Sequence, residues 1–258
     1  MPLLGENNGV LNFESASAAT GIDDIEVYPR IEEPEDYVEE PEKVVSSQYE
    51  IGMQSCSLWQ NGKQFGWDAI AAFPDRKPYL GYYDEPKSEV ADWEIKWMSE
   101  HGITFQTYCW FRPGGGDGTP IKIPTYGDAL NEGFMEAKYS DDLKFTIMFE
   151  NANSGFTGEA DFRQNLVPYW IEYYFKDPRY MTIDNKIVFS FYSYSRLIEA
   201  FGSEAKVKEN MDYLREKCRE IGYDGAIIWI ASQASSGAQL EACGLDGYYA
   251  YKWGSQGS

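Results

Sequence analysis

The sequence contains few of the residues on which several common kinds of site depend. It has one histidine, His101, and four cysteines, none of them in a CxxC pair. Zinc sites are usually built from several Cys and His ligands, and a Ser-His-Asp triad needs a well-placed histidine. His101 ends a predicted helix, where its ring meets the helix dipole. We expect no metal site and no cofactor; carboxylate-only calcium binding is possible, but no EF-hand spacing occurs.

Long apolar runs and basic clusters are missing as well. No run of 18 apolar residues occurs in the sequence, so no membrane span is predicted. The first residues, MPLLGENNGV, lack the basic and apolar regions of a signal peptide. The net charge is −20, and residues 1–50 hold 13 acidic and 2 basic residues, or −11 of it. Such acidity repels nucleic acid and anionic lipid, so neither is expected as a partner.

The cysteines are predicted to be free and buried. Cys56 and Cys109 lie in apolar, strand-like runs, Cys218 lies on a helix face, and Cys243 is the fourth. Their spacing is irregular, and free cysteines are among the residues most often buried. Aromatic residues, in contrast, are abundant at 16%, with 20 Tyr and 8 Trp. That is more than a core of this size needs, so some rings are expected to line a surface.

The chain divides by composition into three parts. Residues 31–47, IEEPEDYVEEPEKVVSS, are acidic and rich in proline, which predicts a linker. Residues 1–30 before it contain two strand-like pieces and are interpreted as the remnant of a β-sandwich module, with a loosely ordered leader as the alternative. The closing piece, IDDIEVYP, resembles the last strand of carbohydrate-binding jelly-roll modules. Residues 48–258 are predicted to form the main domain.

Apolar runs alternate with helical patterns throughout this domain. Continuous apolar runs suit parallel strands that are covered on both faces. Helices are expected after a cap at Ser88, over about 126–138, from Phe162 to Tyr174, from Val207 to Ile221, and near 236–243. The predicted strands are 49–59, 103–111, 144–150, 186–192, 225–232 and 246–252.

Repeated strand–helix units predict right-handed parallel crossovers, either in a doubly wound sheet or in a (β/α)8 barrel. Aromatic and polar residues recur where the predicted strands end, and in a barrel those ends share the face that carries the chemistry. We therefore predict a (β/α)8 TIM-type barrel. About six of its eight units are found, so we expect the sequence to be a fragment, truncated at the C-terminus and also at the N-terminus.

Several segments resemble the glycoside hydrolase family 99-like group, which includes WbsX-like proteins. They are the stretch WDAIAAFPDRKPYLGYYDEPKSEVADWEIKWMSEHGITFQTYCWF, the third strand KFTIMFEN, the segment YYFKDPRYMTIDNK and the sixth strand DGYYAY. The resemblance covers residues 49–254. It implies a barrel that processes α-mannosides or related glycans, typically as a retaining endo-glycosidase. The catalytic carboxylate pair of the group lies in a late motif like N-E-W-x-E, which we expect beyond Ser258.

The resemblance also implies roles for individual residues. Glu150 matches a strand-three carboxylate that contacts the sugar, and Tyr251 matches a tyrosine near the catalytic acid. Trp110 ends the second strand, where the group places an aromatic ring against the sugar; core packing is the alternative. Position alone suggests weaker substrate-binding candidates, for each of which an ordinary strand-end or loop role is the alternative: Trp59, Tyr82, Tyr83, Asp84, Glu85, Arg112, Asn151, Tyr192, Gln233 and Trp253.

Three functions follow from these features. The first is a glycoside hydrolase acting on mannan-like oligo- or polysaccharide, the second a WbsX-like glycosyltransferase, and the third a non-catalytic glycan-binding protein. A polysaccharide substrate and a preceding sandwich-like remnant suggest a secreted, periplasmic or cell-surface protein.

Overall fold

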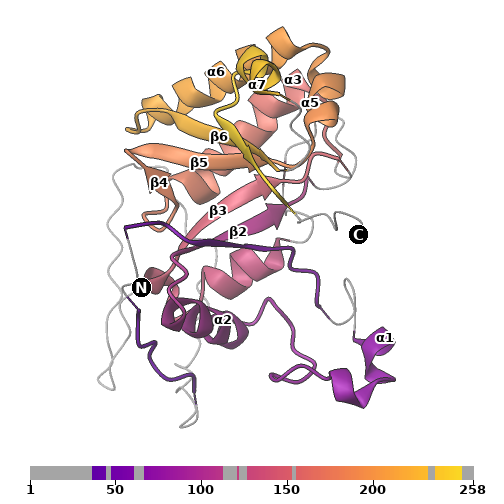
Figure 1. Ribbon diagram of the computed structural model, residues 1–258, viewed down its shortest axis with the longest axis vertical. Helices are drawn as coiled ribbons and strands as arrows, with labels where there is room; N and C mark the ends of the chain where they lie inside the picture. Colours follow the sequence, from indigo (N-terminus) through magenta and orange to yellow (C-terminus); the bar gives the residue numbers. More distant parts are fainter. Residues whose placement is uncertain are drawn as a thin grey trace, which may run out of the picture. The chain divides into compact units, whose positions relative to one another are not determined.

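Six parallel strands form one curved sheet, and their order in the sheet follows the chain. They are β1 (Gly52–Ser55), β2 (Phe105–Trp110), β3 (Lys144–Phe149), β5 (Lys186–Phe191), β6 (Ala226–Ala231) and β7 (Gly247–Tyr249). Figure 1 shows the computed structural model, which describes residues 37–44, 48–60, 67–112, 121, 127–152, 155–231 and 236–251. The chain divides into two units, 1–37 and 38–258, and the sheet belongs to the second.

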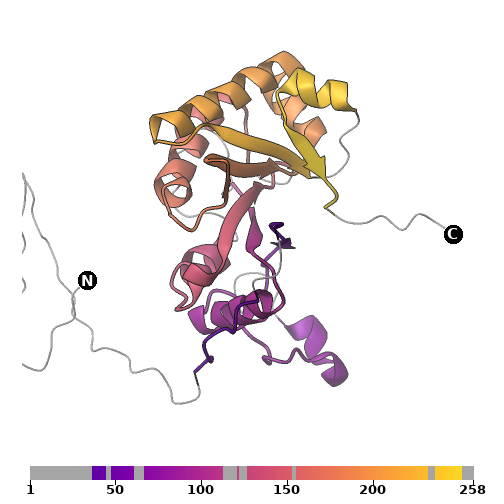
Figure 2. The ribbon, with the colours of Figure 1, turned by 60° about the vertical axis from the view of Figure 1, so that its left-hand side comes forward.

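Helical segments connect the strands, and all except α1 and η1 pack against one face of the sheet (Figures 1 and 2). The longest are α2 (Ser88–Glu100), α5 (Tyr194–Phe201), α6 (Glu204–Glu220) and α7 (Gly237–Cys243). Short ones are α1 (Asp68–Ala71), η1 (Pro74–Arg76), η2 (Ala129–Phe134) and η3 (Ser140–Asp142), and four consecutive segments follow β3: α3 (Glu159–Asp161), η4 (Phe162–Leu166), α4 (Val167–Trp170) and η5 (Ile171–Phe175).

This arrangement is a partial (β/α) barrel, as predicted. A doubly wound sheet reverses its strand order at a switch point, whereas these six strands follow one another without reversal. The sheet also curls into a half-barrel with its helices outside (Figure 2). Each of the six predicted strand ranges contains one observed strand, so the predicted fold class is confirmed.

The core between the sheet and the helices is dominated by aromatic rings. Phe145, Phe149, Phe189 and Phe191 point outward from β3 and β5 and are completely buried. Trp170 reaches them from α4, and its ring centroid lies 4.7 Å from that of Phe189 and 5.4 Å from that of Phe149. Burial of apolar area on this scale is the main stabilising contribution to the fold.

The helix predicted from Phe162 is present but irregular. Its residues at i+4 steps, Phe162, Leu166, Trp170 and Tyr174, are all buried, as the pattern indicates. The segments η4 and η5 are π-helical and flank α4, whose second residue is Pro168. Proline has no N–H to donate within a helix, and such interruptions widen the neighbouring turns.

Some local predictions differ from the structure. Ser88 was expected to cap its helix, but Lys87 holds the N-cap position and makes no side-chain cap. The side chains of Ser193, Ser203 and Ser236 accept the capping hydrogen bonds of α5, α6 and α7 instead. Helix α5 and the two-residue strand β4 (Thr182–Ile183), which pairs antiparallel with β5, were not predicted.

Part of the predicted linker packs on the barrel unit. The Tyr139 hydroxyl donates a hydrogen bond to the Val38 carbonyl at 2.8 Å, and the Val44 amide donates to the Ser99 carbonyl at 3.1 Å. Lys43 forms an ion pair with Asp142. Residues 38–44 therefore run along α2 and η3 in an extended conformation.

Candidate functional site

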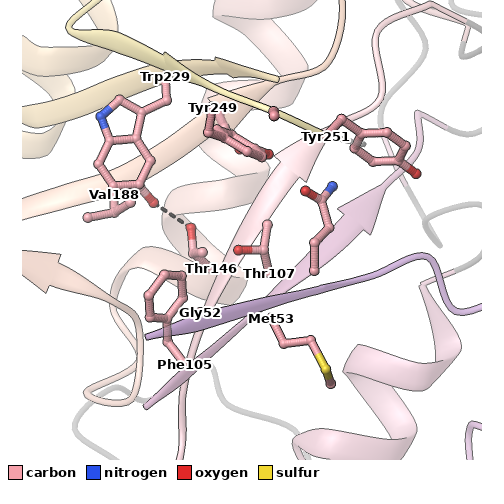
Figure 3. Close-up of a pocket in the computed structure, with 12 residues that line it drawn as sticks. Gly52, Met53, Phe105, Thr107, Thr146, Val188, Trp229, Tyr249 and Tyr251 are labelled. Atoms are coloured by element: carbon pink, nitrogen blue, oxygen red, sulfur yellow. Dashed lines mark hydrogen bonds between the residues drawn. The ribbon is translucent and has the colours of Figure 1, made fainter. Parts of the chain in front are cut away.

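The inner, concave face of the sheet differs in composition from the outer face. Strand residues alternate between the faces, so the neighbours of the outward aromatic residues point inward. A cavity of about 450 Å³ lies there, and Figure 3 shows Trp229, Tyr249 and Tyr251 on one side of it and Phe105 and Met53 on the other. Polar side chains contribute to its lining: Gln54, Thr107, Thr146, Ser190, Tyr249 and Tyr251.

Hydrogen bonds join several of these inward side chains. The Thr146 hydroxyl donates to the Val188 carbonyl at 2.6 Å, and the hydroxyls of Ser190 and Tyr249 lie 3.3 Å apart. The Gln54 amide nitrogen approaches the Met148 sulfur at 3.0 Å. The Gln54 amide oxygen, Oε1, is buried and accepts no hydrogen bond from any residue that the structure describes. An unsatisfied acceptor beside a cavity is a place where a polar ligand or water binds favourably.

Glu150 follows β3 directly and belongs to the inward series that begins with Thr146 and Met148. Its side chain is buried, and its Oε1 atom accepts a hydrogen bond from the Ala152 amide at 3.2 Å. Its backbone amide donates to the Trp110 carbonyl at 2.8 Å, which extends the β2–β3 pairing by one residue. The carboxylate is therefore held at the C-terminal rim of the half-barrel by regular strand geometry.

Tyr192 and Tyr251 lie at the same rim. Their ring centroids are 5.2 Å apart in an edge-to-face arrangement, and both rings pack against an inner cluster formed by Cys109, Met148 and Ala231. Burial and the neighbouring thiols raise the pKa of Tyr251 above its usual range, so its hydroxyl keeps its proton at neutral pH. Tyr251 lowers the pKa of Cys56, and the charge of Glu150 raises it.

Cys56 is exposed, which corrects the prediction that all four thiols are buried. It follows the end of β1, where the sheet edge meets solvent. Cys109, Cys218 and Cys243 are free and buried, as predicted.

Trp110 is on the other face of the sheet. Its side chain is only 1% exposed, its ring contacts Phe149 and Trp170, and its Nε1–H donates to the Tyr174 hydroxyl at 3.1 Å. Even-numbered residues of β2 point outward, so the indole fills the helix–sheet core. Of the two interpretations of Trp110, core packing fits this placement.

Asn151 holds two loops together. Its amide nitrogen donates to the Ser193 carbonyl at 2.9 Å, and its amide oxygen accepts from the Ser193 amide at 2.8 Å. The end of β3 is thereby fixed to the start of α5. Asn151 is 3% exposed, so its amide already has protein partners on both sides.

The other candidates at this rim lie in the long connection between β1 and α2. Trp59 and Glu85 exchange hydrogen bonds: the Trp59 amide donates to the Glu85 carboxylate at 2.7 Å, and the Glu85 amide donates to the Trp59 carbonyl at 3.0 Å. Trp59 stacks on Trp67 with ring centroids 4.1 Å apart, and the Trp67 Nε1–H donates to the Tyr83 carbonyl at 2.6 Å. Asp84 accepts the Lys87 amide through its carbonyl oxygen. Tyr82 is 38% exposed beside Trp67.

Two carboxyl groups in this connection and on α2 hold protons more strongly than usual. Burial raises the pKa of Glu85 to about 8, and the nearby charges of Glu94 and Cys56 act in the same direction. Burial raises the pKa of Glu94 to about 7. Burial and both carboxylates raise the pKa of Tyr83 to about 12. Tyr83 and Glu85 were candidates by their position in the sequence, whereas Glu94 was not, because it joins them only through tertiary packing.

Arg112 forms a buried ion pair on the outer side. Its guanidinium donates to the two carboxylate oxygens of Asp161 at 3.0 and 2.8 Å, and both side chains are at most 1% exposed. Asn165 donates a further hydrogen bond to Asp161. Arg112 therefore has a structural role in this arrangement. Gln233 and Trp253 lie outside the described residues.

Within the described part of the chain, no cluster of three or more His, Cys, Asp or Glu side chains is arranged to hold a metal ion. In the same residues, no helix is both long and apolar enough to cross a bilayer.

Comparison with known proteins identifies the fold. The sequence matches no family model and no curated protein. Among solved structures, it is similar to a GH99 endo-alpha-mannosidase from Bacteroides thetaiotaomicron in complex with BIS-TRIS-propane, with a TM-score of 0.53, 13% identity and coverage of 78% of this chain and 58% of that one. A second structure of the GH99 endo-alpha-mannosidase from that organism gives a TM-score of 0.46 at 16% identity, with coverage of 68% and 47%.

The chain spans 58% of the length of the first of these structures. An identity of 13% supports a conclusion about the fold alone. The predicted resemblance to the family 99-like group is confirmed at that level, and the chain has a GH99-like partial barrel fold.

Proposed function

We propose that the inner rim of this half-barrel binds a glycan, and that the barrel is that of a glycoside hydrolase acting on α-mannoside-like oligo- or polysaccharide. The observation that carries the proposal is the position of Glu150. Its carboxylate is held at the C-terminal end of β3, and Tyr192 and Tyr251 pack on the inner cluster at the same rim. In (β/α)8 barrels, this rim is where substrate binds.

The chemistry of the rim suits a sugar. A carboxylate accepts hydrogen bonds from sugar hydroxyls and stabilises positive charge that develops on the ring during glycosidic cleavage. The rings of Tyr192 and Tyr251 offer apolar surface for the C–H faces of a pyranose, and the Tyr251 hydroxyl remains a donor at neutral pH. Hydrolysis generally uses two carboxyl groups on either side of the scissile bond. We propose that Glu150 binds the sugar and that the glycosidic bond is hydrolysed with retention of the anomeric configuration.

Binding can be tested by calorimetry with α-mannan oligosaccharides and the full 258-residue chain. Glu150→Gln keeps the shape of the side chain and removes its charge. Hydrogen bonds to charged groups contribute roughly 1.5–3 kcal/mol, so the affinity should fall about tenfold to a hundredfold. Glu172→Gln, at an exposed position on the outer helices, is the matched control and should leave the affinity unchanged. Equal affinities for both variants and the unmodified protein would contradict the assignment of Glu150.

The reaction class needs a separate assay. Incubation with α-mannan alone should release oligosaccharide if the barrel is a hydrolase. Transfer only in the presence of a sugar nucleotide would identify a glycosyltransferase, and glycan binding without turnover under both conditions would identify a binding protein.

The cellular location and domain organisation are part of the same proposal. We propose a secreted, periplasmic or cell-surface protein with a sandwich-like segment at 1–30, a linker at 31–47 and the barrel at 48–258. Cell fractionation tests the proposed location. Limited proteolysis tests the proposed domain organisation, because cleavage should concentrate in the linker before residue 38.

A further inference from the structure

Two cysteines occupy neighbouring positions at the inner rim. Strands β1 and β2 are parallel, and their register pairs Gln54 with Thr107 and Ser55 with Tyr108. Continuing this register by one residue places Cys56 beside Cys109. Neighbouring strands are about 4.8 Å apart, which lies within the Cα–Cα range of about 4.4–6.8 Å that disulfides span.

Both side chains belong to the inner face. Cys109 is part of the inner cluster with Met148 and Ala231, and the Gln54 amide nitrogen lies 3.6 Å from its sulfur. The two thiols are close enough to shift each other's pKa, and Tyr251 is close enough to affect both. We propose that Cys56 and Cys109 form a redox-active dithiol site, in which Cys56 attacks small-molecule disulfides such as oxidised glutathione and Cys109 resolves the product.

The two thiols are suited to different steps. Cys56 is exposed, whereas Cys109 is buried. Hydrogen bonds from Cys109 and Tyr251 lower the pKa of Cys56 to about 7, against the opposing effects of burial and of the Glu150 charge. Glu85 is the other charged group whose field reaches Cys56. A substantial fraction of Cys56 is therefore thiolate at neutral pH, and the thiolate is the nucleophile.

Cys109 acts second because its proton is held while Cys56 is ionised. Its hydrogen bond to Cys56 is the largest cause of its raised pKa, followed by burial. Once the Cys56 sulfur is tied into a mixed disulfide, its negative charge is gone. The Cys109 thiol then loses its proton more readily and attacks the Cys56 sulfur.

The exchange balances without any further reactant. The Cys56 thiolate forms a bond to one sulfur of oxidised glutathione, and the glutathione disulfide breaks to release one glutathione thiolate. The Cys109 thiolate then forms the Cys56–Cys109 bond and releases the second. The two protein thiols are oxidised, one glutathione disulfide is reduced to two thiols, and the two protons of the cysteines pass to glutathione.

The test equilibrates the full chain in mixtures of reduced and oxidised glutathione, followed by acid quenching, alkylation under denaturing conditions and peptide mapping by mass spectrometry. We expect a peptide cross-linked through Cys56 and Cys109, whereas Cys218 and Cys243 remain free to be alkylated. A glutathione adduct that persists on Cys56 without the cross-link would overturn the resolving role of Cys109. Cross-links that involve Cys218 or Cys243 to the same extent would overturn the assignment of a specific pair.

A kinetic measurement tests the roles separately. The rate at which Cys56 of the native protein reacts with iodoacetamide should rise with pH around a midpoint near 7. Cys109→Ala removes one hydrogen-bond donor and should move the midpoint upward. If the pKa of Cys56 returns to about 8.5, the rate at pH 7 falls about threefold, because a roughly sixteenfold loss of thiolate is partly offset by its greater nucleophilicity.

Cys218→Ser is the control, since Cys218 is a residue of α6 and is buried in the helix–sheet core on the outer side of the sheet. It should leave both the midpoint and the rate unchanged. A Cys56 midpoint that is the same in the native protein, in Cys109→Ala and in denaturant would refute the proposal. These measurements read thiol chemistry alone, so their outcome is independent of whether the rim binds a glycan.

Discussion

The two faces of the same sheet are filled in opposite ways. The outer face carries Phe145, Phe149, Phe189 and Phe191 against the helices, and its rings are completely buried. The inner face carries hydroxyls, thiols, an amide and tyrosines around a cavity of about 450 Å³. Strand alternation alone separates the two sets. The outer face therefore stabilises the fold, whereas the inner face presents side chains that can bind a ligand or react.

The sharpest test of this comparison uses two adjacent residues of β5. Phe189→Ala removes a fully buried outward ring that contacts Trp170, and large-to-small changes of this kind cost about 3–5 kcal/mol of the free energy of unfolding. Ser190→Ala removes one inward hydroxyl near Tyr249 and should cost about 1 kcal/mol. Urea unfolding followed by circular dichroism measures both. Equal losses at the two positions would mean that the inner face stabilises the fold as much as the outer one.

An intermediate loss of unfolding free energy is expected at Asn151, which lies at the inner rim but makes hydrogen bonds that stabilise the fold. Asn151 lies at the rim next to Glu150, yet both ends of its amide are bonded to the backbone of Ser193. Asn151→Ala leaves that backbone without its partners and should cost about 2 kcal/mol of the free energy of unfolding. Denaturant titration and glycan affinity should be measured together. Unchanged stability with lost affinity would instead make Asn151 a sugar contact.

The strands were predictable because fully buried parallel strands appear as continuous apolar runs. Residues on the strand ends were harder to assign, because their position along the strand does not say which face they occupy. Glu150 and Trp110 end neighbouring strands, and one faces inward while the other faces outward. Because side chains alternate between the two faces of a strand, counting from the buried aromatic residues of each strand would have assigned Glu150 and Trp110 to opposite faces.

Other features could not be predicted from local patterns. Trp59 and Glu85 are 26 residues apart and meet through two hydrogen bonds, one from the Trp59 amide to the Glu85 carboxylate and one from the Glu85 amide to the Trp59 carbonyl. Strand β4 begins a tight hairpin whose turn residues, Asp184 and Asn185, have positive φ angles of 48° and 55°. Asp and Asn tolerate that conformation better than most residues, so the pair was a usable turn signal in the sequence.

The smallest effect concerns pH and lies outside both faces, in the Glu85–Glu94 cluster. The folded protein holds protons on these carboxyls up to about pH 8 and about pH 7, whereas in the unfolded chain they leave near the ordinary value of 4.5. A carboxyl whose folded pKa is raised stabilises the fold below its unfolded pKa, and this contribution is lost as the pH rises through the folded value. The free energy of unfolding should therefore fall between about pH 5 and pH 8, by an amount on the order of 1 kcal/mol after allowance for partial exposure.

Glu85→Gln and Glu94→Gln replace each carboxyl by a neutral group of the same size, which should flatten this slope and make the variants relatively more stable at the alkaline end. Glu89→Gln, at an exposed position on the same helix as Glu94, should keep the slope of the unmodified protein. Urea midpoints measured at several pH values across this interval decide between them. Parallel curves for all four proteins would assign the pH dependence to other groups and leave the raised pKa values of Glu85 and Glu94 without a thermodynamic consequence.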